Sequence, residues 1–153
     1  MADNKYIGGE NMISLIIGKK GTGKTKVLVE HVNDAVHVSS GNVVCVEKET
    51  KLTYDVNYRA RLIATDVFGI SGYDAFYGIL IGVCAGDHDI TDIFVDATYR
   101  IADDKNRTGE ALAEFLAKVN ELSKISGTKF TFTISSDLED LPESMFEYCE
   151  KLN

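Results

Sequence analysis

The chain has 153 residues, of which 44% are hydrophobic, which suits one compact domain with a sizeable core and argues against a two-domain enzyme. Its 24 acidic and 16 basic side chains give a formal net charge of −8, which argues against a broad nucleic-acid-binding surface. Three cysteines without metal-ligand spacing and the lack of any run of eighteen apolar residues predict a cytoplasmic protein with no disulfide, zinc site or membrane span.

Residues 1 to 11 precede the first apolar run and have neither periodicity nor a signal-peptide pattern. Three alternatives stay open for them: a disordered tail, a translation start upstream of Met12, or a remnant of an expression vector. Residues 12 to 153 are expected to form a single domain.

The segment from Met12 to Ile17 is nearly continuously apolar, which predicts a strand buried on both faces of a parallel sheet. A helix-period segment follows from about Gly23 to Val36. The turn between them fits the pattern G-x-x-x-x-G-K-[ST] at every fixed position. The residues of this phosphate loop are Gly18, Lys19, Lys20, Gly21, Thr22, Gly23, Lys24 and Thr25.

In such a loop the backbone N–H groups and the helix N-terminus together hold a polyphosphate. We therefore predict a nucleoside triphosphate site. Lys24 is expected to contact the β- and γ-phosphate oxygens as a catalytic residue, and the Thr25 hydroxyl to bind Mg²⁺.

The next segments read as two strands. Asn42 to Val46 is apolar except for Asn42, and Glu47 follows it. Apolar and polar residues then alternate from Tyr54 to Leu62, which predicts a strand with one solvent-exposed face that continues to Ala64. We expect this strand near a sheet edge, with antiparallel pairing to the second strand as one option.

Helices and strands continue to alternate in the second half of the chain. The expected helices are residues 73–84, 108–123 and a short one after Pro142, and the expected strands are 90–95 and 130–134. Close helix packing is one explanation of Gly78 and Gly82 in the first of these helices. The alternation predicts an α/β domain with a doubly wound, mainly parallel sheet and helices on both faces.

The strand at 90–95 ends in Asp96. Ligands of open parallel sheets bind beyond the carboxyl ends of the strands, which is where a carboxylate can organise Mg²⁺ and its waters. We therefore favour a metal-binding role for Asp96 over a helix-capping role.

From Met12 to about Ser136 the element order and these motifs resemble the P-loop NTPases, in particular their RecA-like or ASCE division. The resemblance implies ATP and Mg²⁺ as cofactors and a γ-phosphate sensor at Ser135 or Ser136. Small bacterial proteins of this kind are sometimes labelled twitching-motility ATPases, but the histidine motifs and preceding domain of pilus-retraction motors are missing here.

Many members of that division carry a glutamate directly after the strand aspartate, where this chain has Ala97. RecA-like rotary ATPases carry it at the end of the strand after the first helix. Glu47 occupies a similar place and is the candidate for orienting water, with Glu49 as a substitute and two solvated charges as the alternative. Arg100 or Arg107 is a candidate arginine finger across an oligomer interface, against the alternative of a solvated loop arginine.

These features predict an Mg-ATP-binding protein with slow or partner-stimulated ATPase activity. A kinase of a small, nucleoside-type molecule is one alternative, although the zinc cysteines of thymidine-kinase-like enzymes are missing and no acceptor pocket is evident. A non-catalytic module, in which ATP binding switches a protein contact, is the other. The second partner is accordingly an unidentified protein or a small-molecule acceptor.

Overall fold

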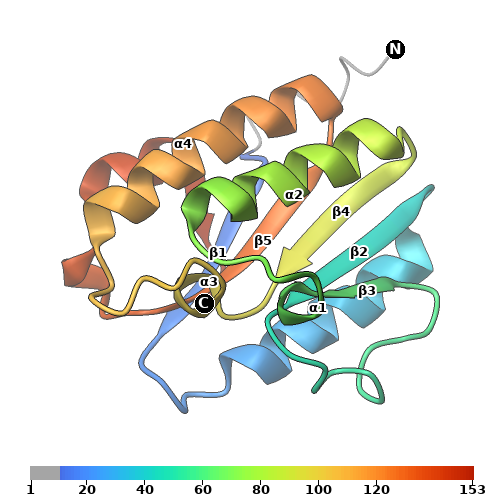
Figure 1. The fold of residues 1–153 in the computed structure, drawn as a ribbon, viewed down its shortest axis with the longest axis horizontal. Coiled ribbons are helices and arrows are strands. Elements are labelled where there is room, and N and C mark those ends of the chain that lie inside the picture. The colour runs from blue at the N-terminus through green and yellow to red at the C-terminus, as the bar shows by residue number, and fades with distance from the viewer. Residues whose placement is uncertain (1–10) are drawn as a thin grey trace.

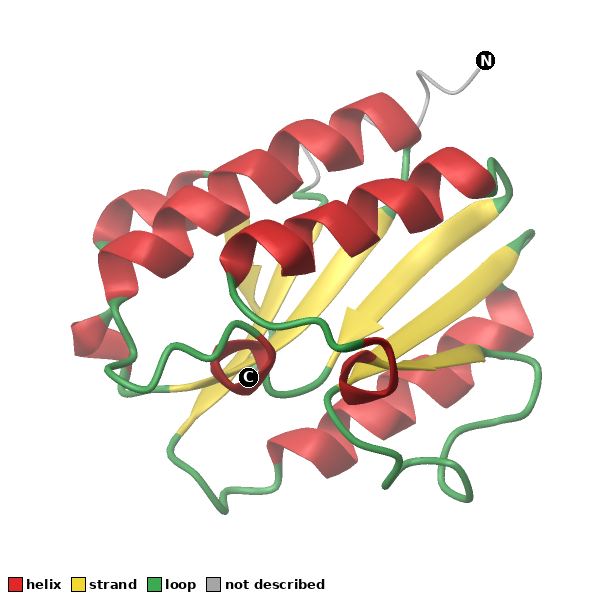
Figure 2. Ribbon diagram, in the orientation of Figure 1, coloured by secondary structure: helices red, strands yellow, loops and turns green. Residues whose placement is uncertain are grey.

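A sheet of six parallel strands runs through the protein in a computed structural model that describes residues 11–153 (Figures 1 and 2). The strand order is β3-β2-β4-β5-β1-β6. The strands are β1 (Ile13–Gly18), β2 (Asn42–Glu47), β3 (Arg61–Ala64), β4 (Ile90–Val95), β5 (Lys129–Ser135) and β6 (Cys149–Lys151). The prediction for residues 1 to 11 lies, except for Asn11, outside the described residues.

Helices cover both faces of the sheet. Helix α1 (Lys24–Val38) lies on one face, and α2 (Tyr73–Gly86) and α4 (Gly109–Ser126) lie side by side on the other (Figure 1). Short helical segments occupy connections: α3 (Thr98–Ile101), η2 (Thr65–Phe68), η3 (Leu138–Asp140) and η4 (Glu143–Glu147). The predicted α/β class, with helices on both faces of a parallel sheet, is confirmed.

Two hydrophobic cores explain the apolar run of β1. Ile16 joins the core beneath α1, while its neighbours Leu15 and Ile17 join the core beneath α2 and α4. In the second core the rings of Phe76 and Phe115 stack with centroids 4.6 Å apart. Because successive side chains of a strand point to opposite faces, a strand covered on both faces must be apolar at every position.

The predicted strand over residues 54–64 is wrong for residues 54–60, which form a loop, and is confirmed only for its last four residues. The structure has only β3 there, and it pairs parallel with β2, so the antiparallel option is wrong as well. A parallel pair needs a return connection. This connection crosses α1, where the Asn33 side chain donates to the Asp55 carbonyl at 3.0 Å and accepts from the Asn57 N–H at 2.8 Å.

The alternating residues up to Ala60 instead form a loop, in which only some of the apolar side chains are buried. Val56 and Ala60 pack in the core beneath α1, whereas Tyr54 and Tyr58 are 99% and 91% exposed. The expected place of the third strand at a sheet edge is confirmed by β3.

The C-terminal segment differs from its prediction. The helix after Pro142 is the 3₁₀ segment η4, and β6, which was not predicted, pairs parallel with β1. Beyond β6, the Asn153 side chain donates to the Ile17 carbonyl at 2.7 Å and accepts from the Ile17 N–H at 3.0 Å. The strand that carries the phosphate loop is therefore paired along both edges.

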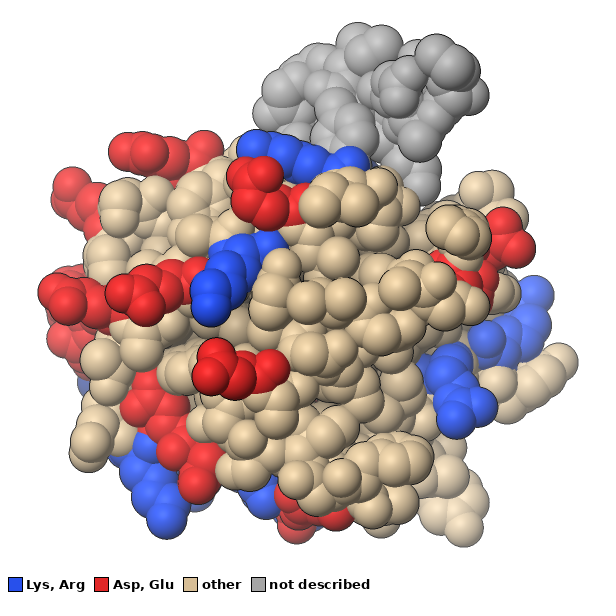
Figure 3. Space-filling view, turned by 45° about the horizontal axis from the view of Figure 1, so that its top comes forward, with Lys and Arg blue, Asp and Glu red and all other residues tan. Residues whose placement is uncertain are grey.

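Helix α2 has no charged residue between Asp74 and Asp87. A Cβ atom added at Gly78 or Gly82 would meet nothing within 4 Å, so close helix packing does not explain these glycines. The side of the molecule that carries α2 and α4 shows a broad uncharged area with acidic and basic side chains around it (Figure 3). None of the helices in residues 11–153 has the length and apolar character needed to cross a membrane.

Candidate functional site

Four strand ends bring the predicted site residues to one edge of the sheet. The β1–β5 register places Gly18 opposite Ser135, and the β2–β4 register places Val46 opposite Val95. Glu47 and Asp96 are the next residues after that second pair. Residues from the whole length of the chain thus meet beyond the carboxyl ends of parallel strands, where such folds bind ligands.

The predicted phosphate loop, Gly18–Thr25, has a tightly turned backbone that leads into the N-terminus of α1. Gly21 and Gly23 take left-handed φ angles of 82° and 86°, which L-residues rarely adopt. A Cβ atom at Gly18 would lie 2.6 Å from the Thr22 hydroxyl oxygen, so a side chain there would displace Thr22. The first turn of α1 has neither a capping side chain nor an acidic residue, so its N–H groups remain available to an anion.

Lys24 is folded back within the loop. Its ammonium donates to the Lys19 carbonyl at 2.8 Å, beside the Thr22 hydroxyl, which donates to the same oxygen at 2.7 Å. Partial burial lowers the pKa of Lys24, Asp96 raises it, and the charge of Arg107 lowers it further. An arriving polyphosphate would offer this ammonium a charged partner in place of a neutral carbonyl.

The Thr25 hydroxyl lies against the carboxylate of Asp96. Its Oγ1 is 3.1 Å and 3.2 Å from the two carboxylate oxygens, although the residues are 71 positions apart. Thr133 of β5 supports this carboxylate, because its hydroxyl donates to Asp96 at 3.0 Å and accepts the Ala97 N–H at 2.6 Å. Sequence reasoning passed over Thr133, whose only signal was a place in an alternating strand.

This pair fits Mg²⁺ bound together with a phosphate. Residues 11–153 contain no group of three His, Cys, Asp or Glu side chains that could hold a metal ion without help. Mg²⁺ usually keeps several waters and binds through one or two carboxylates plus substrate phosphates. Thr25 and Asp96 would supply the protein's share of such a site.

Glu47 is a buried carboxylate. It is 4% exposed, and its two oxygens accept the N–H groups of Lys51 at 2.9 Å and Leu52 at 3.2 Å. Burial raises the pKa of Glu47, while these two hydrogen bonds lower it. The alternative of a solvated charge at the strand end is therefore wrong for Glu47. Its carboxylate is buried, and its two hydrogen bonds hold the loop after β2 in place.

Glu47 nevertheless faces the Thr25–Asp96 pair. These three residues line a cavity of about 180 Å³ together with Glu49 and Arg100. The carboxylate of Glu49 is partly exposed and forms ion pairs with Arg100 at 2.5 Å and Lys51 at 3.3 Å. Arg100 is thus tied to its own chain, which does not favour a role across an oligomer interface.

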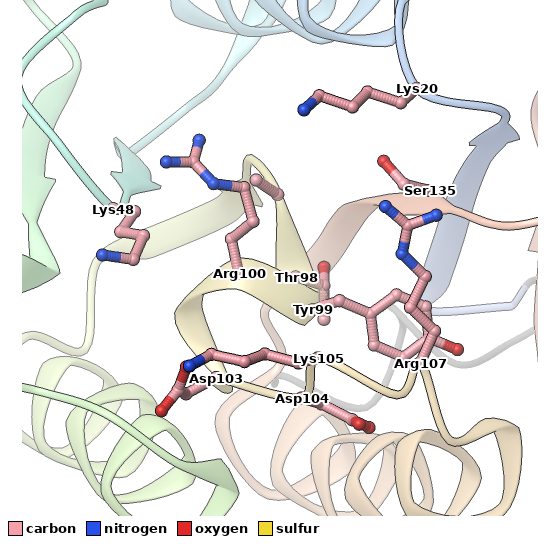
Figure 4. A pocket seen from close by; sticks show the side chains of 11 residues that line it. Lys20, Lys48, Thr98, Tyr99, Arg100, Asp103, Asp104, Lys105, Arg107 and Ser135 are labelled. Atoms are coloured by element: carbon pink, nitrogen blue, oxygen red, sulfur yellow. The ribbon is translucent and has the colours of Figure 1, made fainter.

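A larger cavity, of about 510 Å³, lies beside α3 and was not predicted (Figure 4). We call it the α3 cavity. Its lining residues are Lys20, Lys48, Ala97, Thr98, Tyr99, Arg100, Asp103, Asp104, Lys105, Arg107 and Ser135. Of the two sensor candidates, Ser135 lines this cavity, whereas the Ser136 hydroxyl donates to the Asp137 carbonyl at 2.9 Å.

The backbone around the α3 cavity is strained. Ala97, Asp103 and Arg107, with φ angles of 65°, 53° and 51°, are the non-glycine residues with positive φ in residues 11–153, and all three line the cavity. Left-handed backbone costs an L-residue about 1–2 kcal/mol. Such strain tends to collect at functional sites.

Replacing Ala97 with glycine should therefore stabilise the protein. Glycine in place of alanine raises the entropy of the unfolded chain, which destabilises the folded state by about 0.5–1 kcal/mol. The relief of the left-handed strain at Ala97 is larger than this loss, so we expect Tm to rise by about 1–4 °C. Thermal unfolding followed by circular dichroism would measure it. The matched control is Ala117→Gly in the exposed face of α4, which should lower Tm, and a fall in both variants would contradict the strain at Ala97.

No protein-family model matches the chain, and no curated protein matches it in sequence.

Proposed function

We propose that the protein binds a nucleoside triphosphate with Mg²⁺ at the phosphate loop, Gly18–Thr25, and has the P-loop NTPase fold. The observation that carries this proposal is the contact of the Thr25 hydroxyl with the Asp96 carboxylate at 3.1 Å and 3.2 Å. A helix N-terminus could bind many anions, but a hydroxyl and a carboxylate meeting beside it favour a phosphate that brings a divalent cation.

Each loop residue has a separate role in this proposal. The N–H groups of the loop and of the first turn of α1 hold the phosphates, which needs the left-handed glycines. Lys24 leaves the Lys19 carbonyl for the β- and γ-phosphates. Thr25 and Asp96 hold Mg²⁺, and Ser135, opposite Gly18 in the sheet, contacts the γ-phosphate.

Slow hydrolysis of ATP is the activity that we propose for this site. Glu47 lines the same small cavity as Thr25 and Asp96, so water held there could meet a carboxylate of raised pKa. Both Glu47 oxygens already accept backbone hydrogen bonds, which leaves less freedom to take up a proton. The arrangement therefore favours slow or partner-stimulated turnover over rapid turnover.

The metal role of Asp96 is tested with Asp96→Asn. Loss of the charge that faces Mg²⁺ should weaken nucleotide binding in Mg²⁺ by about tenfold or more, with a smaller change in EDTA, because charge-assisted contacts contribute about 1.5–3 kcal/mol. Titration of a fluorescent ATP analogue, with and without Mg²⁺, would measure both values. Asp34→Asn, on the exposed side of α1, is the matched control. An Mg²⁺ response equal to that of the parent would assign Asp96 a structural role.

A further inference from the structure

The α3 cavity concentrates positive charge in an acidic protein. Five of its lining residues are cationic, Lys20, Lys48, Arg100, Lys105 and Arg107, and two are acidic, Asp103 and Asp104. The chain as a whole has a net charge of −8. A cavity of opposite sign to the whole molecule indicates an anionic ligand.

Three of these cations lack a partner. Lys48 pairs with Asp66 and Arg100 with Glu49. Within residues 11–153, the side chains of Lys20, Lys105 and Arg107 form no ion pair or hydrogen bond. Figure 4 shows the Arg107 guanidinium beside Ser135, with Lys20 above them. Lys20 comes from the phosphate loop, and Lys105 and Arg107 come from the segment after α3, so the three line one cavity only in the folded protein.

Buried hydroxyl groups at the same cavity also lack partners. Among residues 11–153 three buried side-chain polar atoms form no hydrogen bond, and two of them, Thr98 Oγ1 and Tyr99 Oη, belong to residues that line the α3 cavity. Thr98 is 0% exposed. In Figure 4 its hydroxyl points into the space between Arg100 and Arg107. An unsatisfied buried hydroxyl is unfavourable by itself, so it indicates a ligand atom that completes the hydrogen bond.

From these observations we infer that the α3 cavity is a second binding site, for a small molecule that carries an oxyanion. Arg107 and Lys20 hold the oxyanion, which is a phosphate ester or a carboxylate, and the Thr98 hydroxyl donates a hydrogen bond to it. A volume of about 510 Å³ lies within the range of small-molecule pockets. The strained turns at Ala97, Asp103 and Arg107 fix the position of the segment that forms this site.

The second site adjoins the nucleotide site and shares two residues with it. Lys24 and Thr25 do not line the α3 cavity, and Lys20 and Ser135 are the phosphate-site candidates that do. Arg107 is close enough to lower the pKa of Lys24. The inference that the α3 cavity binds an oxyanion does not depend on the nucleotide proposal. The inference that this oxyanion lies next to a γ-phosphate rests on the proposed function.

The test uses glycerol 3-phosphate and succinate as probes, a phosphate ester and a carboxylate. The full chain is first saturated with Mg-ADP, so that the phosphate loop is occupied, and each probe is then titrated by calorimetry. We expect saturable binding with one site per chain for at least one probe. The probe that binds more tightly identifies the class of oxyanion.

Two variants locate the bound probe. Arg107→Gln and Thr98→Val should each weaken binding of the probe by about tenfold or more, because each removes a donor to a charged group. Thr98→Ser keeps the hydroxyl and should retain binding. Arg61→Gln, a charge-matched change on the edge strand β3, should leave it unchanged. Without any ligand, Thr98→Val should raise Tm, since it removes an unsatisfied hydroxyl.

The outcomes separate this inference from the nucleotide proposal. If the protein does not bind Mg-ADP but binds a probe in a way that depends on Thr98 and Arg107, the second site is supported and the nucleotide proposal is contradicted. Saturable binding of neither probe, or binding that Thr98→Val and Arg107→Gln leave unchanged, would overturn the second site. Loss of probe binding in Lys24→Ala measured without nucleotide would also overturn it, because the probe would then lie in the phosphate loop.

Discussion

In a Lys24→Ala variant, the affinity for Mg-ATP is expected to fall about tenfold to hundredfold while the fold is retained. The ammonium makes one hydrogen bond, to the Lys19 carbonyl at 2.8 Å, and no part of Lys24 belongs to either hydrophobic core. Its charge is therefore available to the phosphates, and charge-assisted hydrogen bonds contribute about 1.5–3 kcal/mol. Isothermal titration calorimetry would give the affinity, and circular dichroism the fold.

The control for this variant is Lys26→Ala. Lys26 is an exposed lysine of the same helix turn, two residues beyond Lys24 and outside the phosphate-loop pattern. Equal losses of affinity in the two variants would mean that ATP is attracted by the overall positive charge of this region and that Lys24 has no specific role. An unchanged titration in Lys24→Ala would remove the nucleotide site from this loop.

The second large effect is expected in turnover. If Glu47 accepts the proton of the attacking water, Glu47→Gln should lower phosphate release by about 10²–10⁴-fold, because an amide cannot act as the base. Mg-ATP affinity should stay near that of the parent. Phosphate release under single-turnover conditions, measured beside a calorimetric titration, would provide both numbers.

The hydrogen bonds of Glu47 add a stability effect to this variant. A glutamine has one acceptor oxygen for the N–H groups of Lys51 and Leu52, so the free energy of unfolding should fall by about 1–3 kcal/mol. If Glu47→Gln lowers both Tm and the affinity for ATP, Glu47 has a structural role and is not the catalytic base. Glu49→Gln, at the partly exposed carboxylate two residues further along, tests the substitute candidate in the same assay. A parent protein that releases no phosphate above background would favour the non-catalytic module.

The sequence was sufficient to predict those candidate site residues that lie in a contiguous motif or directly after a strand. The phosphate-loop motif is contiguous, and Asp96 follows a short, mainly apolar run that predicts a buried strand. The contact between Thr25 and Asp96 could be expected because parallel strands deliver their ends to one edge. The hydrogen bonds of Thr133 to Asp96 and Ala97 could not be expected, since they depend on which strand lies next to β4.

The α3 cavity and the loop over residues 54–60 could not be predicted, because they depend on backbone geometry that the pattern of apolar and polar residues does not reveal. The α3 cavity is shaped by left-handed turns at Ala97, Asp103 and Arg107, residue types that carry no turn signal comparable to glycine. Residues 54–60 alternate like a strand, but they form a loop that buries Val56 and Ala60 against α1 and leaves Tyr54 and Tyr58 exposed. In both places long-range packing overrode local preference.

The pairing of β1 also determines when the site can form during synthesis. Among the described strands β1 emerges first, yet its partner strands β5 and β6 span residues 129–135 and 149–151. The side chain that bonds to Ile17 lies 136 positions later. Contacts over such separations form slowly, and an unpaired apolar strand is prone to aggregation meanwhile. A nascent chain released before residue 129 therefore carries the whole loop sequence, Gly18–Thr25, on a strand without a neighbour, and the proposed nucleotide could not stabilise that strand until β5 has been made.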